Sequence, residues 1–255
     1  MKYIIITLFF FSTVNKNYAQ EDYKPFSIGI KLGANFCKFT EPIGEYAAND
    51  SLNYSRSSLI RPTIGLIFRF KLSNVFFIQP ELNYILKGGS YKALKYSYTS
   101  IGGTNPGEKE EYYLKKSYRL NYIEIPLLLS INLSKLINPK KEEGILGVNL
   151  TGGLAPAINT NSTFKYNKLT STNVSNSPIV NVSESTSLEE FDGASKFVLN
   201  YIIDFSFNFE VSKQAYFLSI RFNNAITKAY KITELNGYNM NTKTSTVTVG
   251  GGIQF

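Results

Sequence analysis

Apolar and polar residues alternate with a period of two along most of this chain. From Phe197 to Phe209 every second residue is aromatic or aliphatic, and Asn200, Asp204 and Asn208 are among the residues between them. Successive side chains of a β-strand point to opposite faces of a sheet. The alternation therefore predicts a strand with one apolar face and one polar face, which is typical of antiparallel sheets.

Seven further segments repeat this pattern, so the sequence predicts eight strands of about ten residues each. The eight segments are 26–33, 60–70, 76–87, 117–133, 146–154, 197–210, 216–223 and 246–255. In the fourth, the phase slips near Glu124-Ile125-Pro126, where we expect a β-bulge to accommodate the proline. A tilted strand of about 9–11 residues crosses a bilayer, whereas soluble sandwiches use strands of about five or six. The predicted fold class is all-β, an eight-stranded antiparallel up-and-down transmembrane β-barrel.

Short and long connections alternate strictly between the predicted strands. The short or intermediate ones are Leu72–Asn74, Ser134–Glu143 and Val211–Gln214, and the long polar ones are Thr40–Leu59, Gly88–Lys116, Asn159–Lys196 and Thr227–Thr242. Outer-membrane barrels have short periplasmic turns and longer external loops. We therefore expect an outer-membrane location with both termini periplasmic. The stretch 159–187, rich in Asn, Ser and Thr, is expected to be a solvated loop that serves either as a surface-binding element or as a spacer.

Charged residues indicate which face of each strand avoids lipid, because an Arg or Lys that faces lipid at mid-bilayer costs roughly 2–4 kcal/mol. The predicted lumen charges share one parity and are Lys31, Arg61, Arg69, Glu81, Asp204, Glu210 and Arg221. An eight-stranded barrel is just wide enough for side chains to fill it, so we expect a packed polar interior and no open channel. Arg69–Glu81 and Glu210–Arg221 are candidate ion pairs, because each joins neighbouring strands, although the sequence does not fix the register.

Aromatic residues of the opposite parity gather at both ends of the predicted strands. Phe26 and Phe255 are examples at one end, and Tyr84 and Tyr118 are examples at the other. Lipid-facing barrels carry two such aromatic girdles.

The first 19 residues have the organisation of a secretory signal peptide. Lys2 gives a positive start, Ile4–Phe11 is apolar apart from Thr7, and the small residue Ala19 precedes a polar stretch. The apolar run is too short to cross a bilayer as a helix. We expect a signal peptide over 1–19 and the outer-membrane β-barrel domain over 20–255.

The residue content excludes several kinds of chemistry. The chain has no histidine and one cysteine, Cys37, which excludes cysteine–histidine catalysis and His/Cys metal centres. The carboxylates of Glu81, Glu124, Asp204 and Glu210 are expected to neutralise lumen arginines and not to act as acids or bases. Basic residues are scattered in runs of no more than two, so we expect no nucleic-acid binding. We predict no catalytic, cofactor-binding or metal-binding residues, and no enzyme.

Several motifs resemble those of the PorT-like outer-membrane β-barrel family. They are Ile28–Asn35, Ile78–Tyr84, Tyr122–Leu128 and Gly250–Phe255. The resemblance implies an eight-stranded barrel in the outer membrane, with Tyr122, Glu124 and Pro126 as the most specific motif residues. It also implies that the terminal aromatic residue Phe255 belongs to the sorting signal that the outer-membrane assembly machinery reads. Members of the family mostly lack a known biochemical activity, and one branch takes part in protein secretion.

The expected function is that of a non-enzymatic outer-membrane barrel with a structural or surface-recognition role through its long external loops. There are two alternatives, a PorT-like accessory component of a secretion or assembly machine and a narrow solute channel. The expected partners are outer-membrane lipids and lipopolysaccharide, the assembly machinery during biogenesis, and a secretion-system component or surface ligand that the sequence does not identify.

Overall fold

The computed structural model describes residues 25–40, 54–93, 109–138, 147–173, 180–190, 193–211, 214–232 and 240–255. Its elements are β1 (Phe26–Phe39), β2 (Tyr54–Ser57), β3 (Leu59–Lys71), β4 (Phe76–Ala93), β5 (Lys109–Glu124), β6 (Leu127–Asn132), α3 (Leu133–Ile137), β7 (Gly147–Asn173), β8 (Val180–Glu190), β9 (Phe197–Val211), β10 (Gln214–Ala225), β11 (Tyr230–Ile232), β12 (Met240–Thr242) and β13 (Thr244–Gln254). Within this part of the chain, no helix has the length and apolar character needed to cross a membrane.

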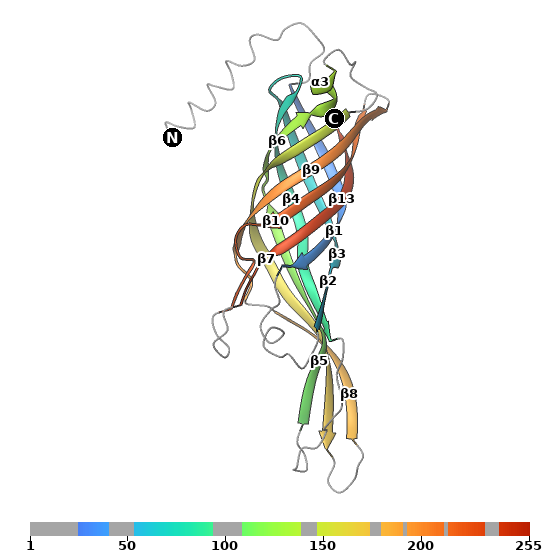
Figure 1. The fold of residues 1–255 in the computed structure, drawn as a ribbon, viewed down its shortest axis with the longest axis vertical. Coiled ribbons are helices and arrows are strands. Elements are labelled where there is room, and N and C mark those ends of the chain that lie inside the picture. The colour runs from blue at the N-terminus through green and yellow to red at the C-terminus, as the bar shows by residue number, and fades with distance from the viewer. Residues whose placement is uncertain are drawn as a thin grey trace, which may run out of the picture.

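The barrel is closed and antiparallel, and its wall has eight strand positions, which we call staves (Figure 1). Seven staves are single strands, and β5 and β6 together make the eighth. Each stave pairs with the next along the chain, in the order β1, β3, β4, β5 with β6, β7, β9, β10 and β13. The last strand then pairs with the first, from Gly29 opposite Gln254 to Phe39 opposite Thr244. Closure satisfies the backbone groups of both outer strands, which lipid would otherwise leave without partners. The predicted fold class is confirmed.

The stave made by β5 and β6 is interrupted at Ile125-Pro126 without a change of register. Glu124 lies opposite Ala157 of β7, and Leu127 lies opposite Leu154, so both strands advance by the same number of residues. Pro126 lacks a backbone N–H, but its carbonyl oxygen accepts a hydrogen bond of 2.9 Å from the backbone N–H of Glu81. The predicted bulge at Pro126 is therefore wrong.

An irregularity in this stave lies earlier, between Asn121 and Tyr122. Asn121 is opposite Asn161 and Tyr122 is opposite Asn159, so Thr160 of β7 is the extra residue. The Thr160 hydroxyl donates a hydrogen bond of 3.2 Å to the carbonyl oxygen of Asn121. This side-chain bond compensates for part of the pairing that the bulge disrupts.

The two ends of the barrel differ. One end, called the α3 end, carries α3 and the C-terminus, and the Phe255 N–H bonds the carbonyl oxygen of Ile28 there at 2.8 Å (Figure 1). The connection predicted as a turn at Ser134–Glu143 begins within α3, which Asn132 caps by accepting a bond from the Lys135 N–H at 3.0 Å. The opposite end, where β7 extends past the barrel and pairs with β8, is called the β8 end.

At the β8 end, β5 and β7 continue beyond the barrel and form a narrow sheet with β8 (Figure 1). The last residue of β7 that pairs with β9 is Ile158, yet β7 runs on to Asn173 between β5 and β8. The prediction of a solvated loop over 159–187 is wrong for 159–173 and 180–187, which are strands. β2 and the β11–β12 hairpin likewise lie in stretches predicted as loops.

The two faces of the wall follow the alternation of the sequence. Outward residues such as Leu32, Ile60 and Leu218 are 59–68% exposed and form the lipid-facing surface. Tyr118 is an exception to the predicted aromatic girdle, because it is buried in the interior. The register passes through Pro126 without a slip, so Tyr118 shares the inward parity of Tyr122 and Glu124.

Candidate functional site in the barrel interior

A network of charged residues centres on Glu81 of β4. The Arg221 guanidinium of β10 donates to both carboxylate oxygens of Glu81, at 2.7 Å from Nη1 and 2.8 Å from Nη2. Lys31 of β1 also contacts this carboxylate through its ammonium group. The amides of Gln79 and Asn83 donate to it at 2.8 and 3.0 Å. Five donated hydrogen bonds therefore hold one fully buried carboxylate in place.

Arg221 connects this carboxylate to a second one. Its Nε donates to Oδ2 of Asp204 on β9 at 2.6 Å, while its two terminal nitrogens face Glu81. The four charges of Lys31, Glu81, Asp204 and Arg221 sum to zero. Because transfer of charges into a low-dielectric interior costs several kcal/mol per ion, neutrality and full hydrogen bonding are the conditions under which such a group stays charged.

Gly65 of β3 leaves space for this network. A Cβ atom at this position would lie 2.0 Å from Oδ1 of Asn83 and 3.0 Å from Cε of Lys31. Both residues donate to Glu81, so a side chain here would push two of its donors away. The need for space explains a glycine in the middle of a strand, where it otherwise weakens the sheet.

A second network centres on Glu124 of β5, nearer the β8 end. Lys87 of β4 lies 3.2 Å from Oε2 of Glu124, and the side chains of both are 1% exposed. Asn200 and Asn223 donate to the Glu124 carboxylate at 3.0 Å each, and Oδ1 of Asn223 accepts a 2.9 Å bond from Lys87. This network is also electrically neutral. Between the two networks is a small cavity, lined in part by Lys31, Glu124, Arg221 and Thr248, with room for about one water molecule.

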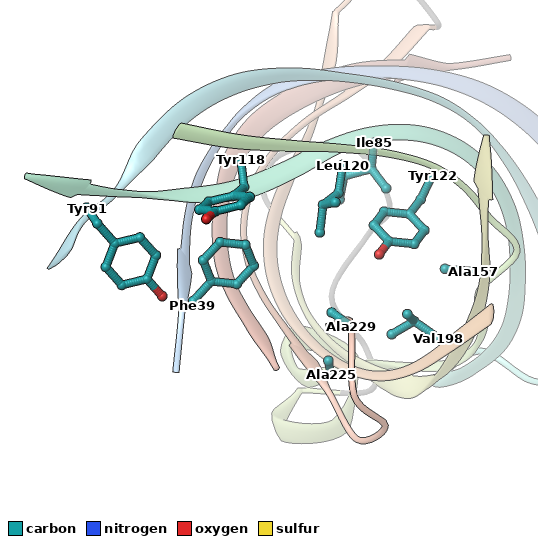
Figure 2. Packing of buried hydrophobic residues seen from close by; sticks show 10 residues of the cluster. All are labelled: Phe39, Ile85, Tyr91, Tyr118, Leu120, Tyr122, Ala157, Val198, Ala225 and Ala229. Atoms are coloured by element: carbon teal, nitrogen blue, oxygen red, sulfur yellow. The ribbon is translucent and has the colours of Figure 1, made fainter. Parts of the chain in front are cut away.

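An apolar layer lies beyond the second network. Figure 2 shows its members, which point inward from several staves and are Phe39, Ile85, Tyr91, Tyr118, Leu120, Tyr122, Ala157, Val198, Ala225 and Ala229. Phe39, Tyr91 and Tyr118 contact one another, with ring centroids 5.9–6.2 Å apart. Gly88, with a φ of +145°, lies beside this layer where a Cβ atom would meet the carbonyl oxygen of Tyr118 at 1.9 Å, and its N–H donates to Sγ of the buried Cys37 at 3.2 Å. The interior is thus filled by polar networks toward the α3 end and by apolar side chains toward the β8 end.

The structure brings together four of the seven predicted lumen charges. Lys31, Glu81, Asp204 and Arg221 form the first network, whereas Arg61 and Arg69 have no ion-pair partner among the described residues. Glu210 belongs to β9, but its side chain lies outside the described part of the chain.

Both predicted ion pairs are wrong. Glu81 binds Lys31 and Arg221 in place of Arg69. Arg221 is in register with Asp204, while Glu210 is in register with Ala215, several residues nearer the α3 end. Charged groups in the lumen pair across the barrel, as Glu81 does with Arg221, as well as between neighbouring strands. The order of the strands alone does not predict which residues pair.

Sequence reasoning missed the partners of Glu124. Lys87 was not among the predicted lumen charges, and Asn200 and Asn223 carry no motif. Among the motif residues, Tyr122 belongs to the apolar layer, Glu124 to the second network, and Pro126 points inward and is buried. Phe255 is 54% exposed beside the first residues of β1. No group of three or more His, Cys, Asp or Glu residues suited to a metal ion occurs in the described ranges.

The closed wall, the lipid-facing apolar belt and the filled interior define a small transmembrane β-barrel. A family model for the outer membrane protein beta-barrel domain matches residues 18–231. The match covers most of the chain, so this protein belongs to the outer membrane protein beta-barrel domain family and is a protein of the outer membrane.

Several solved structures of outer-membrane proteins are similar to this chain at low sequence identity. OprG from Pseudomonas aeruginosa has 11% identity and a TM-score of 0.45, over 91% of this chain and 97% of that one. Ail of Yersinia pestis, in complex with the heparin analogue sucrose octasulfate, has 10% identity and a TM-score of 0.36, over 90% and 99%. The outer membrane protease OmpT from Escherichia coli has 10% identity and a TM-score of 0.39, over 93% and 99%. No curated protein matches the sequence.

Proposed function

We propose that this protein is a non-enzymatic outer-membrane barrel that does not conduct solutes and that presents the sheet at its β8 end for recognition outside the cell. The observation that carries the proposal is the filling of the lumen. The Glu81 and Glu124 networks and the apolar layer follow one another along the barrel axis, and the cavity between the networks has room for about one water molecule. A solute would have to break buried ion pairs and displace the apolar layer to pass.

The sheet formed by β5, β7 and β8 supports the recognition role. From Asn159 to Asn173, β7 extends for roughly 50 Å of strand at about 3.3 Å per residue. A structure that only closed the barrel would not require strands of this length. In this proposal the α3 end and both termini are periplasmic, and the β8 end is external. Outer-membrane lipids and lipopolysaccharide surround the wall, and Phe255 contributes to recognition by the assembly machinery.

Single-channel recording in planar bilayers tests the lumen half of the proposal. The native chain should produce no discrete conductance steps. The double variant Leu120→Ala and Tyr122→Ala, which removes two large members of the apolar layer, serves as the positive control and should raise the leak. Reproducible conductance steps from the native chain would instead favour the narrow solute channel.

A PorT-like accessory role in secretion is the second candidate. The motif at Tyr122–Pro126 supports it, but all three motif residues serve the interior of the barrel, which a shared architecture explains equally well. Affinity capture of the tagged chain after in-cell cross-linking separates the two functions. Recovery of the same periplasmic machine components with the native chain, and their loss when a periplasmic turn is replaced, would favour the accessory role.

A further inference from the structure

Arg69 is a lumen arginine whose charge is not neutralised by any described residue. It points inward from β3, two residues before the strand ends at Lys71, so it lies near the α3 end of the lumen. Its Nε and Nη2 atoms are buried and have no hydrogen-bond acceptor. Buried guanidinium donors without acceptors are costly, because the nitrogen atoms lose water and gain no partner.

The two unsatisfied nitrogens form one edge of the guanidinium plane. Nε and Nη2 present parallel N–H groups, and this edge binds two oxygen atoms of a single oxyanion in bidentate fashion. The face of the same guanidinium lies over the ring of Phe77, with Cζ 3.9 Å from the ring centroid. The ring fixes the plane and thereby the direction in which the free edge points.

The two carboxylates of the first network lie further into the lumen and are already occupied. Glu81 accepts from Lys31, Arg221, Gln79 and Asn83, and Asp204 accepts from Arg221. These charged groups balance one another, so Arg69 adds a positive charge at this end that no described side chain compensates. Ser27 of β1 is in register with Arg69 and shares its inward parity, which places a hydroxyl donor beside the guanidinium.

We propose that Arg69 binds a phosphate group at the α3 end of the lumen, with Phe77 orienting the guanidinium and Ser27 adding a third donor. A phosphate fits this arrangement better than a carboxylate, because it offers oxygens to the bidentate edge and a further oxygen to the hydroxyl. Arg69 as a whole is only half-buried, so part of its side chain reaches solvent at the mouth. Free phosphate and a phospholipid headgroup share this chemistry.

The test uses the full chain folded in dodecyl maltoside, a detergent without phosphate. The chain contains only five arginines, so each Nε–H signal in a ¹⁵N spectrum can be assigned by single Arg→Lys substitutions. Inorganic phosphate, added against sodium chloride at equal ionic strength, should shift the Arg69 Nε–H signal to saturation. Sodium acetate and dodecylphosphocholine are tested in parallel. Saturation with dodecylphosphocholine but not with inorganic phosphate would support the site with a lipid headgroup as the source.

Variants identify the groups responsible. Arg69→Lys keeps the charge but removes the bidentate edge, and calorimetry should show phosphate binding at least about tenfold weaker, equivalent to about 1.4 kcal/mol. Arg61→Lys, at the other end of the same strand, should bind like the native chain. If Arg69→Lys does not fold, Phe77→Leu replaces it and should weaken binding severalfold. The proposal is overturned if no phosphate-bearing probe shifts Arg69, if acetate does so equally well, or if Arg69→Lys binds phosphate as the native chain does.

Discussion

Glu81 and Arg221 face each other across the diameter of the barrel, joined by two hydrogen bonds of 2.7 and 2.8 Å. Their strands, β4 and β10, are separated by the same number of staves in both directions around the wall. The pair therefore links opposite walls, and the Nε bond of Arg221 to Asp204 connects a third strand. Such a link resists flattening of the barrel as well as sliding of any single hairpin.

Glu81→Ala should destabilise the barrel, because it leaves Lys31 and Arg221 buried without their common partner. Breaking a buried pair on one side costs about 3–5 kcal/mol, and access of water to the lumen should lower this value. Urea unfolding in lipid vesicles measures the change. Adding Arg221→Met should recover part of the loss. Glu190→Ala on an exposed position of β8 is the control and should change stability by less than about 0.5 kcal/mol. Equal effects of Glu81→Ala and Glu190→Ala would show that the network does not stabilise the fold.

Removal of Lys87 and removal of Glu124 from the second network should lower the stability of the barrel by different amounts. Lys87→Met leaves Glu124 with donated bonds from Asn200 and Asn223, whereas Glu124→Leu leaves the buried Lys87 ammonium with only Oδ1 of Asn223. We therefore expect Glu124→Leu to cost more, by about 1–2 kcal/mol, because the charge it leaves behind keeps fewer hydrogen-bond partners than the charge left by Lys87→Met. The same unfolding assay compares the two variants. A larger loss for Lys87→Met would mean that the asparagines do not compensate the carboxylate.

Phe205 and Asn208 test the assignment of faces on a single strand. Phe205 is 43% exposed on the lipid side, and Asn208 has the opposite parity. Phe205→Arg should cost roughly 2–4 kcal/mol if it lies near mid-bilayer, while Phe205→Leu and Asn208→Leu should have small effects. Folding yields in vesicles, read as heat-modifiable bands on gels, report the result. A harmless Phe205→Arg together with a damaging Asn208→Leu would reverse the two faces.

The orientation of the barrel can be tested with inserted epitopes. A tag between Asn173 and Val180, next to the end of β7, should bind antibody on intact cells. A tag at Lys140, beyond α3, should bind antibody only after the outer membrane is permeabilised. The first insertion falls between β7 and β8 and the second between α3 and β7, so neither interrupts one of these elements. Exposure of the Lys140 tag alone on intact cells would place the α3 end outside.

The sequence predicts which residues face inward well, because a period of two leaves only one choice per strand. The exception, Tyr118, has one cause. The assumed phase slip near Glu124-Ile125-Pro126 placed Tyr118 on the outward face, although the proline removes only a hydrogen-bond donor and leaves the register unchanged. The strands beyond the barrel were also missed, because Asn, Ser and Thr dominate there. The available signal of alternation was the pair Phe164 and Tyr166, whose ring centroids lie 5.6 Å apart.

The partners inside the lumen were less predictable than the faces. Pairing there depends on the height of each residue along the axis, which results from strand tilt and stagger around the whole wall. Arg69 and Glu81 belong to a hairpin, yet Ile67 is the residue opposite Glu81, so Arg69 lies nearer the α3 end. Lys31 and Arg221, on strands that do not neighbour β4, reach Glu81 instead.

Gly65 gives a test of the network that changes no charge. In Gly65→Ala, the new Cβ would lie 2.0 Å from Oδ1 of Asn83 and 3.0 Å from Cε of Lys31, so both donors to Glu81 must shift. Overpacking of this kind typically costs about 1–3 kcal/mol. Gly147→Ala is a matched control, because its Cβ would meet no atom closer than 3.8 Å. Gly65→Ala should lower the urea midpoint, and Gly147→Ala should leave it within error or raise it slightly through the loss of chain entropy in the unfolded state.

In the Glu81→Ala background the cost of Gly65→Ala should shrink, since Lys31 and Asn83 no longer have a carboxylate to hold. An undiminished cost in that background would mean that Gly65 relieves a clash with the wall and has no part in the network.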